Sequence, residues 1–228
     1  MRIIFVRHGH PDYKTDSLTE LGHLQAQAVA HRLQNEKIDH IFSSSCGRAA
    51  QTAQYIADAR GMEVELLDFM REVKWGSIDE SEIFSGGHPW RTVEKMVNEN
   101  QSLLAENWAE EGAFSNNKIK HCHSFVAEHL DAWLADLGYT RVGNYYRVGT
   151  PRYDTIVLAS HGGSSSCALA HLFSLPLPFL CYAVCPAFTA VTIVSLSGEE
   201  GSLISPRFEI VNDARHIQGV EVENVYGR

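Results

Sequence analysis

The stretch IIFVRHG at residues 3–9 decides the fold, together with a second stretch, IVLASHGG, at residues 156–163. Each is a short apolar run, rich in β-branched residues and without alternation, which is typical of a buried parallel strand. Each run ends at a histidine followed by glycine. Open α/β sheets bind ligands outside the carboxyl ends of their strands, so we expect His8 and His161 to meet in one pocket.

Strands and helices alternate through most of the chain around these two runs. Further strands are predicted at 40–44, 63–67, 190–196 and 207–211, and helices at 20–35, 45–60, 124–137 and 164–173. Thr19 is predicted to be the N-cap of the first helix. This alternation predicts an α/β fold, a three-layer αβα sandwich with a mostly parallel central sheet and helices on both faces.

The length of 228 residues and the 44% hydrophobic content predict a single domain, residues 1–228, with one substantial core. The irregular segment 75–120 is predicted to be a helical insertion, with a helix at 90–108. A Gly-Asn turn between two β-prone tetrads predicts a hairpin excursion at 139–152. Two interpretations of this hairpin stay open, a solvated surface element or a flap that contacts substrate.

Charge and composition exclude several classes of function. The formal net charge is −9, and no basic stripe is present, which argues against a nucleic-acid partner. No run reaches the roughly 18 apolar residues that span a bilayer, so no membrane partner is expected. The N-terminus has no signal segment, and the five cysteines lack framework spacing, which predicts a cytoplasmic protein.

Two arginines in these patterns suit the capture of a phosphoryl group. Guanidinium offers bidentate and permanently charged donors, and Arg7 stands directly before His8. A neutral imidazole can attack phosphorus and form a covalent phosphohistidine. Arg48 follows a predicted strand and starts a predicted helix, where its charge adds to the positive end of the helix dipole.

Three further residues complete a set for phosphoryl transfer. Glu72 is a candidate acid/base, because burial and a nearby anion would keep its carboxyl group protonated. His161 is expected to stabilise charge on the equatorial oxygens in the transition state. The backbone N–H of Gly162 is expected to join it, since glycine lets the chain approach an anion closely.

Five segments, in this order, resemble the histidine phosphatase superfamily, which has the phosphoglycerate mutase-like fold. They are RHG at 7–9, LTxxG at 18–22, RAxxTA at 48–53, the segment around Glu72, and SHGG at 160–163. The resemblance implies a phosphohistidine at His8, a phosphate pocket of Arg7, Arg48 and His161, and an acid/base at Glu72. It also implies that neither a metal nor an organic cofactor is needed.

The chain departs from the family pattern at the rim of this expected site. His10 and Pro11 follow the first motif, and Lys14 stands where family members commonly have an asparagine. His10 and Lys14 are therefore candidate substrate contacts. HCHS at 121–124 replaces the family's Gly-Glu-Ser, and we expect no metal there because no second ligand pair lies at metal spacing.

The sequence therefore predicts a phosphatase that hydrolyses small phosphomonoesters through a phosphohistidine, with a small phosphorylated metabolite as its partner. Two alternatives stay open. One is a phosphotransferase of the phosphoglycerate mutase type, and the other is a binding or regulatory member of the fold with weak catalysis. The oligomeric state also stays open, a homodimer included.

Overall fold

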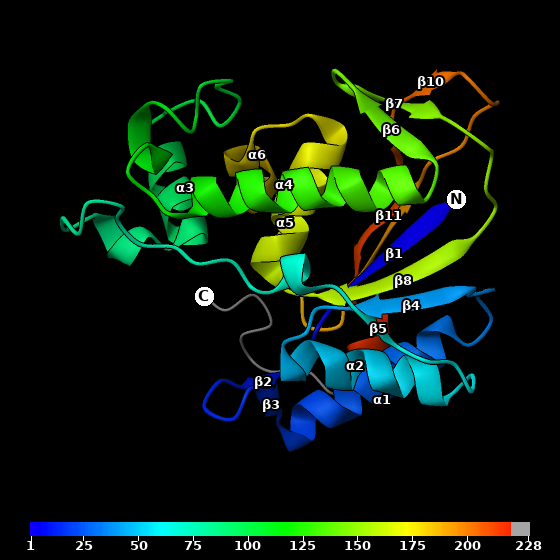
Figure 1. The fold of residues 1–228 in the computed structure, drawn as a ribbon. Coiled ribbons are helices and arrows are strands. Elements are labelled where there is room, and N and C mark those ends of the chain that lie inside the picture. Colours follow the sequence, from blue (N-terminus) through cyan, green and yellow to red (C-terminus); the bar gives the residue numbers. More distant parts are fainter. Residues whose placement is uncertain (220–228) are drawn as a thin grey trace.

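A mixed, mostly parallel sheet forms the centre of the computed structural model, which describes residues 1–219 (Figure 1). Its six strands have the order β11-β9-β1-β8-β4-β5. Their bounds are β1 (Arg2–Arg7), β4 (His40–Ser43), β5 (Glu65–Leu66), β8 (Thr155–Ser160), β9 (Val191–Ser195) and β11 (Arg207–Asp213). The strands from β1 to β5 in this order are parallel, whereas β9 is antiparallel to both β1 and β11.

Helices cover both faces of this sheet, which confirms the predicted three-layer α/β fold (Figure 1). One face carries α1 (Glu20–Leu33) and α2 (Gly47–Asp58). The other carries α4 (Ile119–Asp136), α5 (Gly162–Phe173) and α6 (Leu177–Ala183), and α3 (Pro89–Asn98) packs against α6. Because side chains alternate along a strand, Ile4 and Val6 of β1 join the core under α1 and α2, and Ile3 and Phe5 join the opposite core.

The first helix starts where the sequence predicts and holds the chain that follows β1. Thr19 caps α1, because its Oγ accepts a hydrogen bond from the N–H of Gly22 at 3.1 Å. A side chain at position 22 would place a Cβ 2.2 Å from the carbonyl oxygen of His10. Glycine at the end of the LTxxG motif therefore lets α1 pack directly on the segment next to His8.

The predicted hairpin is confirmed, and it belongs to a second sheet. Strands β6 (Tyr139–Val142) and β7 (Tyr145–Val148) pair on either side of Gly143, whose φ is +59°, and β10 (Leu203–Ile204) pairs with β7. The Arg141 guanidinium donates hydrogen bonds to the carbonyl oxygen of His171 and to Ser174 Oγ. These bonds fasten the hairpin to the carboxyl end of α5 and leave it at one end of α4 (Figure 1).

The insertion is less helical than the sequence predicts. The predicted helix at 90–108 is wrong beyond α3, because the chain turns at Asn100, which has a φ of +55°. The helix predicted from residue 124 starts five residues earlier, since the Asn117 side chain accepts the N–H of Ile119. Short elements complete the chain: β2 (Pro11–Asp12), β3 (Ser17–Leu18), and the 3₁₀ turns at Asp68–Met70, Phe84–Gly87, Gly112–Phe114 and Arg215–Ile217.

All five cysteines are free thiols, and Cys46, Cys167 and Cys181 are buried. Within residues 1–219, no helix combines the length and the apolar character that crossing a bilayer needs.

Candidate active site

Sheet topology brings the two histidines together. β1 and β8 are parallel neighbours, and Arg7 pairs with Ser160, so the next residue of each strand leaves the same edge of the sheet. The rings of His8 and His161 lie 5.0 Å apart between centroids, at 61° to each other. Both side chains are almost completely buried, with residue exposures of 1% and 0%. The two strand-His-Gly patterns thus form one buried centre.

The geometry around His8 leaves its Nε2 atom unprotonated. Nδ1 lies 2.7 Å from the carbonyl oxygen of Gly9, which can only accept a hydrogen bond, so Nδ1 carries the proton. Nε2 accepts a hydrogen bond from Arg48 Nε at 3.3 Å. Burial, followed by the effects of His161 and Arg7, keeps the pKa of His8 well below its usual value. His8 is therefore a neutral imidazole whose lone pair faces a guanidinium.

Arg48 is held from the opposite side by Asp16, a residue that the sequence did not single out. Arg48 lies in the first turn of α2, and its Nη1 lies 2.5 Å from Asp16 Oδ1. The second oxygen of Asp16 accepts the N–H of Gly47 at 2.8 Å. A single carboxylate thus binds both the guanidinium and the amino end of α2, which suits the partial positive charge there.

Thr52, in the RAxxTA motif, ties α2 to the chain after His8. Its Oγ accepts the N–H of Gly9 at 3.1 Å and donates to the carbonyl oxygen of Arg48 at 2.9 Å. A Cβ on Gly9 would lie 2.6 Å from the carbonyl oxygen of Gly22. The segment beside His8 therefore lies between α1 and α2 and fits only glycine at position 9.

His161 is oriented by Ser44, which follows β4. The Nε2 atom of His161 lies 2.9 Å from Ser44 Oγ, and that oxygen also accepts the N–H of Cys46 at 3.2 Å. Ser44 can then donate its hydroxyl proton to Nε2, and in that arrangement the proton of His161 lies on Nδ1, a buried atom without a hydrogen-bond partner. Burial and then Arg48 keep the pKa of His161 well below its usual value.

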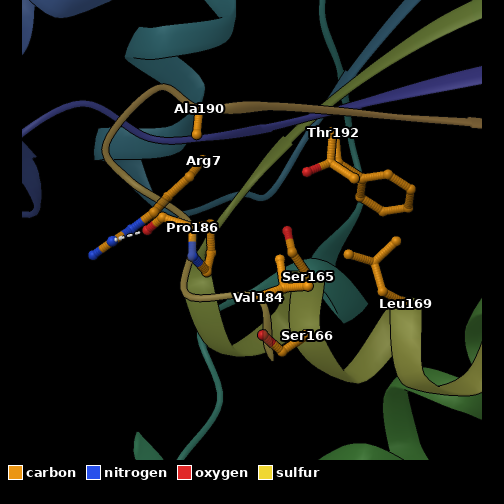
Figure 2. A pocket seen from close by; sticks show the side chains of 9 residues that line it. Arg7, Ser165, Ser166, Leu169, Val184, Pro186, Ala190 and Thr192 are labelled. Carbon is orange, nitrogen blue, oxygen red and sulfur yellow. Dashed lines mark hydrogen bonds between the residues drawn. The ribbon is translucent and has the colours of Figure 1, made fainter. Parts of the chain in front are cut away.

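Arg7 extends from the end of β1 toward Pro186 and away from Ser165 and Leu169, as Figure 2 shows. Its Nη1 donates to the carbonyl oxygen of Pro186 at 2.5 Å, and its guanidinium carbon lies 4.2 Å from the Phe188 ring centroid. Its Nε atom is buried and has no hydrogen-bond partner. A cavity of about 10 Å³, drawn in Figure 2, lies beside the arginine and has room for about one water molecule.

Glu72 faces the amino end of α5. Its Oε1 accepts the N–H groups of Gly163 at 3.1 Å and Ser164 at 3.3 Å, and that of Val73 at 2.9 Å. Burial nevertheless raises the pKa of this carboxyl group, and two of these amides, those of Val73 and Ser164, together with two nearby arginines only partly oppose the rise. A Cβ on Gly163 would lie 2.5 Å from Oε1, so this close approach requires glycine.

A cleft of about 370 Å³ opens beside these groups. Arg7, Glu72 and Gly162 line it at the sheet edge. Aromatic side chains of the insertion line it further out, together with an exposed tyrosine from the loop after β2 and one from α6: Tyr13, Trp75, His88, Trp90 and Tyr182. The arrangement places a buried neutral imidazole, fixed cations and a carboxyl group with a raised pKa next to a space that can hold an organic group.

The two rim residues predicted from the sequence do not line this cleft. His10 Nδ1 lies 2.9 Å from Thr19 Oγ1, and its ring contacts Phe188 edge-on. Lys14 is exposed in the turn between β2 and β3. Their contact with substrate stays a prediction. The hairpin at 139–152 contributes no lining residue either.

The segment 121–123 lies on α4 and is occupied by other contacts. Cys122 Sγ exchanges hydrogen bonds with the backbone of Lys74, and the His123 ring packs edge-on against Trp108. Within residues 1–219, no three His, Cys, Asp or Glu side chains gather in a way that could hold a metal ion.

Sequence signals existed for some of the residues that were not singled out and were absent for others. Trp75 and Trp90 are tryptophans of an irregular segment, where core packing is the simpler interpretation. Ser44 is the last residue of a predicted strand, at the edge where ligands bind. Asp16 gave no signal, because its partner Arg48 is 32 residues away.

Comparisons with known proteins agree with this geometry. The sequence profile of the histidine phosphatase superfamily (branch 1) matches residues 3–207. A probable phosphoglycerate mutase of Yersinia pestis is 29% identical over 188 residues, covering 77% of this chain and 76% of that protein.

Solved structures share the fold at lower identity. A phosphoserine phosphatase of Entamoeba histolytica, in complex with 3-phosphoglyceric acid, has a TM-score of 0.63 at 22% identity and covers 95% of this chain and 99% of its own. An α-ribazole phosphatase of Shigella flexneri has a TM-score of 0.61 at 20% identity, with coverages of 94% and 97%. With the family profile spanning most of its length, the chain belongs to the histidine phosphatase superfamily, branch 1.

Proposed function

We propose that this chain is a phosphatase that hydrolyses small phosphomonoesters through a covalent phosphohistidine at Nε2 of His8. One observation carries the proposal: a neutral, buried imidazole with its lone pair facing Arg48, and a carboxyl group with a raised pKa, both lie within the electrostatic influence of Arg7 and Arg48. The lowered pKa of His8 favours an unprotonated nucleophile, and the raised pKa of Glu72 favours a proton donor, as the first step requires.

In the first step, Arg7 and Arg48 bind the phosphoryl oxygens, and His8 Nε2 attacks phosphorus in line with the ester oxygen. The P–O bond to the alcohol breaks as the N–P bond forms, and Glu72 gives its proton to the departing oxygen. The Nδ1–H of His161 and the N–H of Gly162 stabilise the charge on the equatorial oxygens. Hydrogen bonding of His8 Nδ1–H to Gly9 stabilises the positive charge that develops on the ring.

In the second step, water attacks the phosphohistidine. Glu72, now ionised, takes a proton from this water, the N–P bond breaks, and inorganic phosphate leaves with His8 restored. None of these proton transfers or charge interactions calls on a group from outside the chain. We therefore expect turnover in the presence of a metal chelator.

The test uses 4-nitrophenyl phosphate with wild type and the His8→Ala variant. Removing the nucleophile is expected to lower kcat by roughly 10⁴-fold or more. Rapid quenching of the wild type with labelled substrate should trap a phosphate on the protein that is stable to base and labile to acid. Comparable turnover by the variant would refute the mechanism, and a wild type that traps no phosphate would point to a binding or regulatory member of the fold.

A mutase is the second candidate, because the Yersinia pestis relative is described as a probable phosphoglycerate mutase. The two activities share the phosphohistidine and differ in its acceptor, water or a hydroxyl group of the bound acid. Incubation with 3-phosphoglycerate separates them. Formation of 2-phosphoglycerate without release of phosphate would establish the mutase, whereas release of inorganic phosphate supports the phosphatase.

A further inference from the structure

The cleft continues well past Glu72, into a region that phosphoryl transfer does not use. At about 370 Å³ it is larger than a phosphoryl group needs, so its outer part is available to the alcohol of the substrate. Trp90 connects the two parts. A Cβ on Gly162 would lie 3.5 Å from two atoms of the Trp90 six-membered ring and 3.8 Å from Arg7 Nε. The indole therefore starts where the phosphate site ends.

Three rings form an aromatic wall along the outer cleft. The His88 ring contacts Trp75 at 5.1 Å between centroids and Trp90 at 5.6 Å, with interplanar angles of 65° and 57°. We call Trp75, His88 and Trp90 the aromatic wall. Trp75 remains 37% exposed, and aromatic surface left open beside a cleft is typical of a site for a ligand.

Charge in the outer cleft is balanced. Arg91 is the one lysine or arginine among the residues that line the outer part of this cleft in the described structure, and its Nη1 lies 3.4 Å from Glu94 Oε2. Burial and the neighbouring Arg91 lower the pKa of His88, so its ring is neutral at neutral pH. The outer lining therefore carries no excess positive charge that would attract a carboxylate on the alcohol part of the substrate.

We propose that the alcohol released from the substrate carries a flat, uncharged ring, which stacks on the aromatic wall. This inference rests on the proposed phosphatase activity and narrows its substrate class. It contrasts with acidic phosphoesters such as 3-phosphoglycerate, whose carboxylate would meet no excess positive charge in the outer cleft. Trp75 and Trp90 are specificity-determining residues in this arrangement, while His8 and Glu72 carry out the chemistry.

The test compares three esters with similar bonds to phosphorus: benzyl, cyclohexylmethyl and 4-carboxybenzyl phosphate. The measurement is kcat/KM from release of inorganic phosphate. We expect benzyl phosphate to be best, the cyclohexylmethyl ester to be several-fold worse because its ring is not flat, and the 4-carboxybenzyl ester to be at least tenfold worse. Equal values for the first two, or a preference for the carboxylate, would overturn the inference and leave the phosphatase standing.

Two variants locate the effect. Trp75→Ala removes a partly exposed indole and should raise KM for benzyl phosphate by roughly three- to tenfold. The ratio of kcat/KM for benzyl phosphate to that for the cyclohexylmethyl ester should therefore fall. Trp133→Phe is the matched control, since Trp133 contacts Phe42 edge-on and does not line the cleft. An unchanged ratio of the two esters in Trp75→Ala would contradict the stacking.

Failure of the phosphatase itself has a different signature. If wild type released phosphate from none of the three esters or from 4-nitrophenyl phosphate, the proposed function would be wrong. In that case, the affinities of the wild type for benzylphosphonate and cyclohexylmethylphosphonate, measured by titration, test the aromatic wall, because binding needs no turnover. Tighter binding of the benzyl compound supports the aromatic wall, and equal binding overturns it.

Discussion

The buried centre at the sheet edge and the cleft that opens beside it are built in different ways. At the centre, which we call the phosphate end, His8, His161 and Arg48 are buried, and each is fixed by a hydrogen bond to the backbone or to another side chain. Strand ends and helix starts supply these residues. In the outer cleft, Trp75 lies in irregular chain and His88 directly follows the 3₁₀ turn at Phe84–Gly87, and their side chains are partly open to solvent.

This difference separates chemistry from selectivity. Parallel strands in fixed register can hold a nucleophile and its cations to within a fraction of an ångström, which phosphoryl transfer needs. An irregular segment tolerates changes of sequence without disturbing the sheet. Substitutions at the phosphate end should therefore slow all substrates alike, while substitutions in the aromatic wall should change their ranking.

The largest effect beyond loss of the nucleophile is expected for Glu72→Gln. The amide keeps an oxygen for the N–H groups of α5 but cannot protonate the departing alcohol. We expect kcat for benzyl phosphate to fall by roughly 10²- to 10⁴-fold, and kcat for 4-nitrophenyl phosphate, whose leaving group needs little help, to fall far less. Rates of phosphate release for the two esters measure the difference. An equal loss for both would mean that Glu72 does not act as the acid.

The dependence of activity on pH tests the same role of Glu72 as the acid. The pKa of Glu72 is raised, so its acid form persists above the usual range of a carboxyl group, and activity on benzyl phosphate should decline as pH rises through that pKa. This alkaline limb should be missing in Glu72→Gln. The acid limb should lie below the usual pKa of histidine, because His8 must lose its proton to attack and its pKa is lowered. An acid limb above pH 6.5 would contradict the neutral His8.

A smaller loss is expected for Gly163→Ala. The added methyl group would lie 2.2 Å from Val73 Cγ2 and 2.5 Å from Glu72 Oε1, so the carboxyl group must move. A displacement of this size should lower kcat by roughly 10- to 100-fold for benzyl and cyclohexylmethyl phosphate alike. Ser164→Ala is the control, because it keeps the backbone N–H that Glu72 accepts. A change in the ratio of kcat for the two esters would contradict the assignment of chemistry to the phosphate end and of selectivity to the aromatic wall.

The smallest effect is expected for Asp16→Asn. Asp16 is half-exposed and places a negative charge beside Arg48, where it competes with the phosphate anion. Removing that charge should tighten inhibition by inorganic phosphate by about two- to fivefold, a range set by the modest strength of partly exposed ion pairs. The inhibition constant for phosphate measures the change. Weaker inhibition would show that Asp16 acts mainly by positioning Arg48.

The positions of His8, Arg48 and His161 at one edge of the sheet could be predicted from the sequence, because each of them follows a strand or starts a helix. The apolar runs before His8 and His161 predict parallel strands, and parallel strands end at a common edge. Strand β8 lies parallel beside β1, as the two runs predict. The helix that begins at Gly162 provides the backbone N–H groups from which Glu72 accepts hydrogen bonds. The order of five motifs adds the identity of the family.

The aromatic wall could not be placed from the sequence. Residues 75–88 have no periodicity, so nothing in the pattern tells a cleft tryptophan from a core tryptophan. Trp90 lies in α3, yet the prediction of a helix to residue 108 missed the turn at Asn100 that ends the helical region early. The contact of Asp16 with Arg48 depends on the course of a polar loop, which local sequence does not encode.

The position of β1 has a consequence for how the protein reaches its active form. β1 lies between β8 and β9, so both of its neighbours are translated long after it, once residues 155–195 have emerged. Its apolar strand must wait for pairings of very high contact order, which fold slowly. Recovery of activity during refolding should therefore be a late event, since the strand that carries His8 has neither of its neighbours until the centre of the sheet has closed.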